Sequence, residues 1–334
     1  MVSLKRGDRN AYLDSLKFYL ICVVVLGHTL WEYYNESQAI NSILYYIYTF
    51  HMPLFVYLSG YFSKKMDTNK FKGFLIRTLE TLVLFQTVCV LIKYMDGQKI
   101  TLDFIISPYS VYWYLFSLIL WRSIIQTIPQ KWLEKKIVIV ISCIVGLMAG
   151  FLPISNELAL QRTLAFLPFF FLGYYSRQNG WLDLVRQLPL LMSIFIFSLS
   201  ICLFYFVNHY KILTWARVCE NIPYFDFKDL VARLLIWVLA LGNGITFIRF
   251  SKSSKTAAVL GTFTLYIFVY HQFCIEVLVK FVDKLFVSHS IPVIVVESII
   301  VIIICSLIAT IPFFRHIVNP ITYLLKRKVQ DQNK

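Results

Sequence analysis

The sequence predicts an all-α polytopic membrane protein, a bundle of about ten transmembrane helices with both termini in the cytoplasm. Three observations lead to this prediction. Hydrophobic residues make up 58% of the 334 residues and charged residues only 15%, and the mean hydropathy is +0.68. These values lie far outside the range of soluble domains. Apolar runs also recur at the length of ~20 residues that a spanning helix needs, with short polar segments between them.

The net charge of +14 does not indicate a nucleic-acid partner. A nucleic-acid surface gathers its basic residues on one soluble face, whereas the Lys and Arg residues here lie in short loops between apolar runs. Basic loops of this kind stay on the cytoplasmic side of a membrane and are attracted to anionic lipids. We therefore expect contacts with membrane lipids and no nucleic acid.

Ten segments are expected to cross the membrane, with residues 13–32, 43–62, 74–94, 109–126, 136–153, 162–176, 188–207, 230–248, 257–281 and 291–314. If the N-terminus is cytoplasmic, the inner segments collect most of the 32 Lys and Arg residues, and the first outer loop has none. The sixth segment is short for ~30 Å of hydrocarbon and needs support from its neighbours. We expect one membrane-embedded domain over 1–334, without an appended soluble domain.

The seven cysteines are scattered through the chain without a CxxC pair or a clustered histidine. This spacing predicts neither a disulfide framework nor a metal centre. The N-terminus has a basic start followed by an apolar run that continues without a small-residue cleavage site. We interpret this run as a retained first span and not as a removed signal peptide.

Three of the six histidines, His28, His51 and His271, fall in the middle or outer half of predicted spans. Ionisable residues inside a membrane are expensive and therefore usually functional. Each ring taken singly could be a packing residue, but three at comparable depth favour a shared site. A neutral imidazole accepts a proton near physiological pH, which is what the activation of a hydroxyl group requires.

Charged residues at the cytoplasmic ends of the first and third spans suggest an anion site. Lys17 lies eleven residues before His28, on nearly the same helical face and ~16 Å away along the axis. Asp14 is placed to pair with Lys17, and the two could form only an interfacial pair. Arg77 could be neutralised by Glu80, or it could bind phosphates together with basic neighbours. These neighbours are Lys17, Lys64, Lys65 and Lys72.

Several residues on the predicted outer side could contact an acceptor. Trp113 could stack on a sugar, or belong to the aromatic belt at the membrane interface. Arg162 and Glu157, in a short outer loop, could bind the acceptor or one another. The long outer loop at 208–229 could be an acceptor-binding lid or an interfacial segment.

At these residues the sequence resembles the membrane acyltransferase family 3, and in particular its fucose 4-O-acetylase-like or polysaccharide O-acetyltransferase branch. The first two matching motifs are the fairly specific ones. The motifs are D-S-L-K with V-V-V-L-G-H between 14 and 28, F-H-M-P-L-F-V-Y-L-S-G-Y-F at 50–62, the basic entry to the third span that ends in Arg77, Y-W-Y-L at 112–115, R-T-L-A-F-L-P-F-F-F-L-G-Y-Y at 162–175 and T-L-Y-I-F-V-Y-H at 264–271.

The resemblance implies an integral protein of the bacterial inner (plasma) membrane that takes an acyl-CoA, usually acetyl-CoA, from the cytoplasm. The acceptor would be a cell-surface or exported glycan, such as a lipid-linked sugar, and no metal would be needed. The family's catalytic histidine falls on His28. Lys17 stands where the family often has Arg, and Phe74 stands where the first Arg of its RxxR pattern would fall. A homo-oligomer is also compatible with the sequence.

Our hypothesis places the CoA diphosphate near Arg77, Lys72 and the Asp14–Lys17 pair, with the thioester reaching toward His28. His28 would remove the proton of the acceptor hydroxyl. The oxyanion would be stabilised by His271, Tyr270 or Ser59. In a second version, His28 or His51 carries the acyl group covalently.

Two other function classes stay open at this point. A proton-coupled glycan or lipid transporter, or a flippase, could use the same histidines for proton transfer. A membrane scaffold would have no need of buried histidines, so the sequence favours it least. Binding of CoA by the purified protein would separate the enzyme from the transporter.

Overall fold

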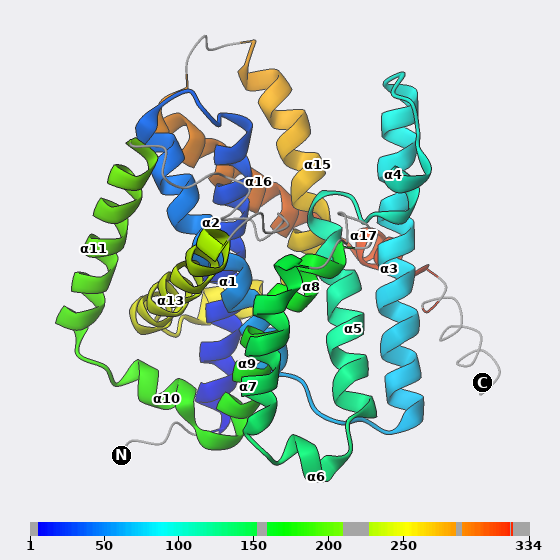
Figure 1. Ribbon diagram of the computed structural model, residues 1–334. Helices are drawn as coiled ribbons and strands as arrows, with labels where there is room; N and C mark the ends of the chain where they lie inside the picture. Colours follow the sequence, from blue (N-terminus) through cyan, green and yellow to red (C-terminus); the bar gives the residue numbers. More distant parts are fainter. Residues whose placement is uncertain (1–5, 152–158, 210–226, 285–288, 321, 323–334) are drawn as a thin grey trace.

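The computed structural model describes residues 6–151, 159–209, 227–284, 289–320 and 322, and this part of the chain is helical with connecting loops (Figure 1). Glu157 and most of the loop at 208–229 lie outside the described residues. The longer helices are α1 Arg6–Glu32, α2 Gln38–Tyr61, α3 Thr68–Met95, α5 Trp113–Thr127, α7 Ile137–Met148, α9 Leu167–Asn179, α11 Leu190–His209, α13 Phe227–Phe250, α15 Thr264–Val282 and α16 Ile291–Thr310. Short helices join them, namely α4 Leu102–Ile106, α6 Gln130–Leu133, α8 Leu160–Ala165, α10 Trp181–Arg186, α14 Lys255–Gly261 and α17 Pro312–Val318.

Five helices in the described part of the chain are long and apolar enough to cross a membrane. They are Ala11–Glu32, Thr68–Met95, Asp229–Phe250, Thr264–Val282 and Ile291–Thr310, and two shorter apolar helices cover Ile137–Phe151 and Leu190–Phe206. Large apolar side chains on these helices face outward, among them Val277, Leu307 and Phe195. A water-soluble protein would not expose such a surface. The chain is an integral membrane protein.

Three of the ten predicted segments are broken in the structure. The segment at 162–176 is divided at Phe166 between α8 and α9, the segment at 257–281 at Thr262 and Phe263 between α14 and α15, and the segment at 291–314 at Ile311 between α16 and α17. The second break follows a close contact with α1, since a Cβ at Gly261 would lie 1.9 Å from the carbonyl oxygen of Asp14. The predicted ninth span was therefore too long at its N-terminal end.

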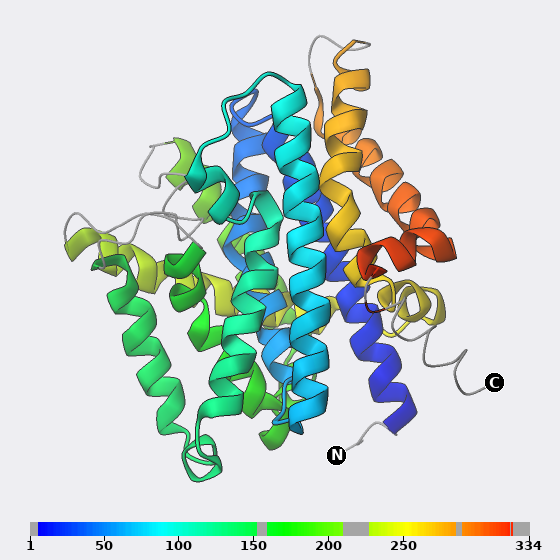
Figure 2. The same ribbon diagram turned by 90° about the vertical axis from the view of Figure 1, so that its right-hand side faces the viewer.

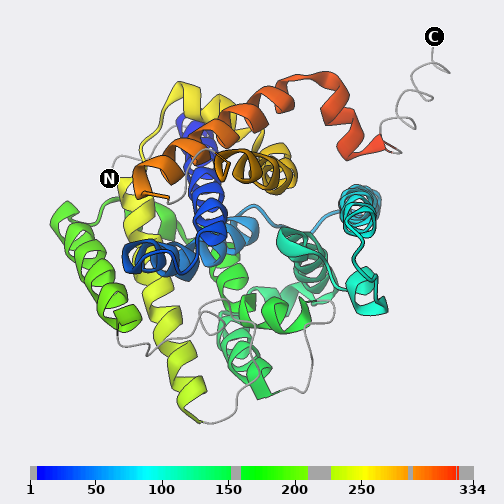
Figure 3. The same ribbon diagram turned by 90° about the horizontal axis from the view of Figure 1, so that it is seen from above.

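The first helix forms the centre of the bundle. It packs against α2, α14, α15 and α16, while α2 also packs against α9, α11 and α13. The view from above shows α1 enclosed by these elements, with α3 and α4 at the periphery (Figure 3). Because α1 packs against both α2 and α15, residues far apart in the sequence meet between these three helices.

The orientation of the helices is not uniform. Figure 2 shows α3 and α5 side by side, in agreement with their contacts, while α13 runs crosswise behind them. Length and hydropathy identify a segment that suits the membrane but leave its tilt undetermined. The packing of α13 against α2, α11 and α10 sets its direction here.

Candidate active site

A cavity of about 590 Å³ opens at the end of the bundle that holds the C-terminal ends of α1, α3 and α15. On α1 its lining extends from Glu32 inward to Val24, and on α15 from Asp283 inward to Phe268. At 1.5 Å per residue the second stretch spans about 22 Å. The cavity is therefore a deep recess that begins at the end opposite to the N-terminus.

The three histidines that the sequence singled out converge at this recess. The ring centroids of His28 and His271 are 5.2 Å apart, and those of His28 and His51 are 6.4 Å apart. His28 and His51 line the cavity, whereas His271 lies directly behind them and is fully buried. Three helices thus contribute one imidazole each to a single cluster.

Two of the rings are held by the turn of helix that precedes them. The Nδ1 atom of His51 lies 2.8 Å from the carbonyl oxygen of Ile47, and that of His271 lies 2.8 Å from the carbonyl oxygen of Phe268. A carbonyl oxygen only accepts hydrogen bonds, so Nδ1 carries the proton in both rings. The Nε2 atoms keep their lone pairs, and that of His271 is buried without a hydrogen-bond partner in the described chain.

The ring of His28 has a different partner. Its Nδ1 atom lies 3.1 Å from the hydroxyl oxygen of Tyr48 on α2. The Tyr48 ring also meets His51 edge to face, with centroids 4.6 Å apart. Sequence reasoning missed Tyr48, although it lies three residues before His51 and therefore on the same helical face.

Polar and aromatic side chains form the outer wall of the cavity. Trp31 follows His28 by three residues and is 37% exposed, with one face stacked on Tyr34. Gln272 and Glu276 of α15 also line the cavity, and the Gln272 amide donates a hydrogen bond of 3.4 Å to Glu276. Sequence reasoning also missed this set. Helical spacing could have suggested Trp31, three residues after His28, but not Gln272 or Glu276, which follow His271 by one and five residues.

Trp113 and Arg162 line the same cavity, but the indole face of Trp113 is covered. The ring of Phe166 stacks on it at 5.5 Å, and the guanidinium of Arg162 lies 5.5 Å from its centroid. Only 7% of Trp113 is exposed. Trp113 therefore packs against Arg162 and helps to hold its guanidinium in place, and Trp31 presents the more accessible indole.

Tyr270 and Ser59, the two expected hydroxyl donors to an oxyanion, are not among the residues that line the cavity. The Tyr270 hydroxyl donates to the carbonyl oxygen of Phe314 at 2.9 Å. Ser59 donates to the carbonyl oxygen of Phe55 and also contacts the Tyr114 hydroxyl. Tyr270 directly precedes His271 on α15, and Ser59 follows His51 by eight residues on α2. Tertiary packing gives both hydroxyl groups partners outside the cavity.

The predicted anion site lies at the other end of the bundle, outside the lining of this cavity. Lys17 and Asp14 form the expected pair, with Nζ and Oδ1 2.6 Å apart, and Lys17 also lies over the ring of Phe62. Lys72 and Arg77 lie on the exposed side of α3. The carboxylate of Glu80 accepts hydrogen bonds from the backbone and hydroxyl of Thr322.

A further cation, Arg122 of α5, lies beside this end of α3. Its guanidinium is 4.7 Å from the ring centroid of Phe74, and its Nε atom is buried without a hydrogen-bond partner in the described chain. Sequence reasoning noted the missing positive charge at position 74 but could not find its substitute. Tertiary packing brings a guanidinium to that position from another helix.

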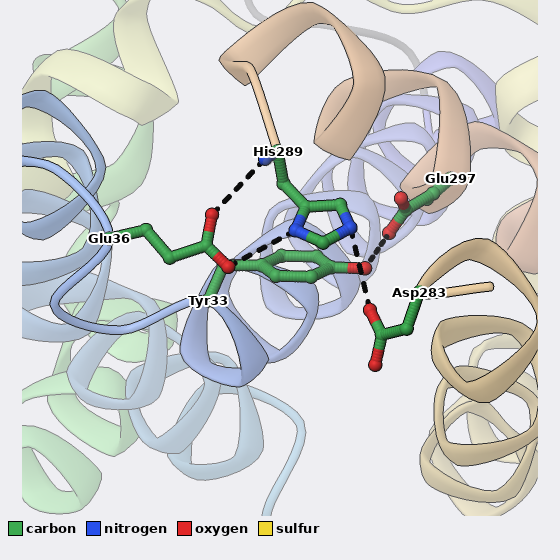
Figure 4. Close-up of polar contacts among 5 residues, drawn as sticks. All are labelled: Tyr33, Glu36, Asp283, His289 and Glu297. Carbon is green, nitrogen blue, oxygen red and sulfur yellow. Dashed lines mark hydrogen bonds and ion pairs between the residues drawn. The ribbon is translucent and has the colours of Figure 1, made fainter. Parts of the chain in front are cut away.

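A cluster of carboxylates, one imidazole and one phenol joins segments that are far apart in the sequence (Figure 4). The ring of His289 stacks on Tyr33 at 4.1 Å and lies 3.1 Å from Glu36 and 3.4 Å from Asp283. The Tyr33 hydroxyl donates a 2.9 Å hydrogen bond to the buried Glu297. The cluster ties α16 to the turn between α1 and α2, and Asp283 also lines the cavity.

The comparisons with known proteins agree with this geometry. A family model described as an acyltransferase domain matches residues 10–311. The nodulation protein NolL of Mesorhizobium japonicum is 27% identical over 192 residues, which is 52% of this chain and 50% of that protein. The match therefore spans about half of the length of that relative. No solved structure matches. Since the family model covers nearly the whole chain, including all three converging histidines, this membrane protein belongs to the acyltransferase family 3.

Proposed function

We propose that the protein is an O-acetyltransferase that moves an acetyl group from cytoplasmic acetyl-CoA to a hydroxyl of a cell-surface or exported glycan. The observation that supports this proposal best is the convergence of His28, His51 and His271 at one recess. Family membership supplies the reaction class of acyl transfer. The donor, the acceptor and the sides of the membrane are parts of the proposal.

His28 acts as the general base because it lines the cavity and has both other imidazoles beside it. The acceptor oxygen attacks the thioester carbonyl carbon while its proton passes to His28. The tetrahedral intermediate then collapses, the bond between carbon and sulfur breaks, and the CoA thiolate takes the proton from His28. The ring returns to its neutral form.

Of the other two histidines, His51 lines the cavity and places the incoming hydroxyl, while His271 is buried behind it. With Nδ1–H donated to a carbonyl, the neutral rings of His51 and His271 offer only an Nε2 lone pair. They accept hydrogen bonds, so neither stabilises an oxyanion while it is neutral. The guanidinium of Arg162 in the cavity wall is the group suited to that role.

The acceptor enters from the open end, past Trp31, Gln272 and Glu276. An accessible indole beside amide and carboxylate groups suits a sugar ring, which has apolar faces and hydroxyl edges. The acetyl-CoA diphosphate binds at the opposite end, near Lys17, Arg77, Lys72 and Arg122, and its thioester arm reaches the deep end of the recess at Val24, Met52 and Phe268.

This arrangement requires a defined topology. We propose ten membrane segments, both termini in the cytoplasm and residence in the bacterial inner membrane, so that the recess opens outward. The basic loops support the orientation, because Lys and Arg collect on the cytoplasmic side.

The test is a comparison of His28→Ala with wild type, by mass spectrometry of surface-glycan esters from cells that express equal amounts of membrane-inserted protein. General-base catalysis contributes roughly 10²–10⁴-fold, so transfer should fall below detection. His316→Ala, in α17 and outside the cavity lining, is the matched control and should retain activity. Full activity of His28→Ala would refute the proposal, and failure of the purified protein to bind CoA would favour a transporter.

A further inference from the structure

The proposed base is the one imidazole of the cluster whose Nδ1 atom meets a side chain. His51 and His271 are held by main-chain carbonyls of their own helices, which fix their tautomer. The Nδ1 atom of His28 meets the Tyr48 hydroxyl at 3.1 Å. A hydroxyl can donate or accept, so the contact itself is compatible with either tautomer of His28.

The contact depends on a close approach of α1 and α2 at Gly27. A Cβ at this position would lie 3.3 Å from Cε2 of Tyr48 and 2.9 Å from Cγ2 of Ile47. The Tyr48 ring therefore occupies the space beside residue 27, next to the ring of His28, with centroids 5.7 Å apart. The absence of a side chain at Gly27 allows this position.

From this geometry we infer that Tyr48 is the positioning residue of His28. Its hydroxyl oxygen accepts the Nδ1–H of His28, which leaves the lone pair on Nε2, the nitrogen farther from the backbone. All three rings of the cluster then have the same tautomer, and the two rings that line the cavity, His28 and His51, offer their Nε2 lone pairs to a substrate hydroxyl. The inference deepens the proposed function and rests on it only for the kinetic part.

The first measurement is the tautomer itself, read by nitrogen NMR of the purified protein in detergent after labelling of histidine with ¹⁵N. His28→Gln identifies the signals of His28 by their loss. In wild type at a pH where the ring is neutral, Nδ1 of His28 should be protonated. In Tyr48→Phe the Nε2–H form should appear. An unchanged tautomer in this variant would overturn the inference.

The second measurement is kinetic, with acetyl-CoA and membranes that contain the cell's own glycan. Tyr48→Phe should lower kcat about tenfold and leave the KM for acetyl-CoA nearly unchanged, because loss of one orienting hydrogen bond affects the chemical step. Tyr45→Phe is the control, since Tyr45 is on the same helix and its hydroxyl bonds to Tyr34 outside the cavity lining. Equal rates for both variants would contradict the role of Tyr48.

Gly27→Ala provides a second route if Tyr48→Phe does not fold. The added methyl group would press on Cγ2 of Ile47 at 2.9 Å and on Cε2 of Tyr48 at 3.3 Å. It should therefore shift this turn of α2 away from α1 while the Tyr48 hydroxyl is retained, and the same change of tautomer is expected. An Nδ1–H tautomer in Gly27→Ala would overturn the inference. If wild type transfers no acyl group but shows the Tyr48-dependent tautomer, the proposed function fails while the positioning of His28 stands.

Discussion

At the scale of single residues, two tryptophans that line the same cavity differ in how accessible their side chains are. Trp113 and Trp31 both line the recess, but Phe166 and Arg162 cover the first, while the second is 37% exposed. A bound sugar needs an accessible indole face. The accessible tryptophan is therefore the better candidate for contact with the acceptor.

Trp31→Ala should raise the KM for the acceptor roughly two- to tenfold with little change in kcat, because aromatic contacts contribute about 0.5–1.5 kcal/mol and this one precedes the chemical step. Initial rates at varied acceptor concentration measure the effect. Trp132→Ala is the control, since Trp132 is exposed on α6, outside the cavity lining. A fall in kcat alone would exclude a binding role for Trp31.

The buried carboxylate of Glu297 depends on Tyr33. The hydroxyl of Tyr33 donates to Oε2 of Glu297, and Oε1 is buried without a hydrogen-bond partner in the described chain. Tyr33→Phe should lower the free energy of unfolding by about 1–3 kcal/mol, the range for a buried polar group that loses its partner. Thermal unfolding in detergent measures the loss of stability. Tyr94→Phe, at an exposed position, is the control. Equal transition temperatures for the two variants would show that the hydrogen bond between Tyr33 and Glu297 contributes nothing to stability.

At the scale of helices, small residues determine how closely α2 and α9 approach. A Cβ at Gly60 would lie 1.8 Å from the carbonyl oxygen of Phe170, and a Cβ at Gly173 would lie 1.8 Å from that of Tyr57. Each helix thus offers a glycine to the backbone of the other. Helices in membranes associate through close backbone packing of this kind, since lipid supplies little hydrophobic driving force between them.

Gly173→Ala should therefore separate α2 from α9 and destabilise the protein by about 1–3 kcal/mol, as overpacking does. Because α2 also holds His51 and Tyr48, activity should fall together with the thermal transition temperature. The control is Gly244→Ala, where a Cβ would meet only Cδ1 of Leu54 at 3.9 Å. Similar behaviour of both variants would show that the glycine contact is dispensable.

At the scale of the whole molecule, the proposed reaction requires that the recess open to the outside while the cationic end faces the cytoplasm. On α1, Lys17 lies near the middle of the helix and His28 near its C-terminal end, eleven residues or about 16 Å apart along the axis. This separation suits a donor and an acceptor that arrive from different compartments. The orientation of α1 decides which compartment supplies each of them.

Fusions to alkaline phosphatase, which is active only outside the cytoplasm, test this orientation. A fusion after Glu36 should be active, and a fusion after Lys334 should be inactive, because we propose both termini inside. A fusion after Asp67, in the loop between α2 and α3, is the inactive control within the same chain. Activity at the C-terminus would contradict an even number of spans.

The sequence by itself determined the membrane environment, the apolar segments and the three buried histidines, because hydropathy and the position of ionisable residues are local properties of the chain. Tertiary structure alone decided that these rings meet, that Tyr48 is the partner of His28, and that Arg122 lies over Phe74. It also decided the break before α15 and the crosswise direction of α13. These features depend on which helices are neighbours, and close packing between helices far apart in sequence sets that arrangement.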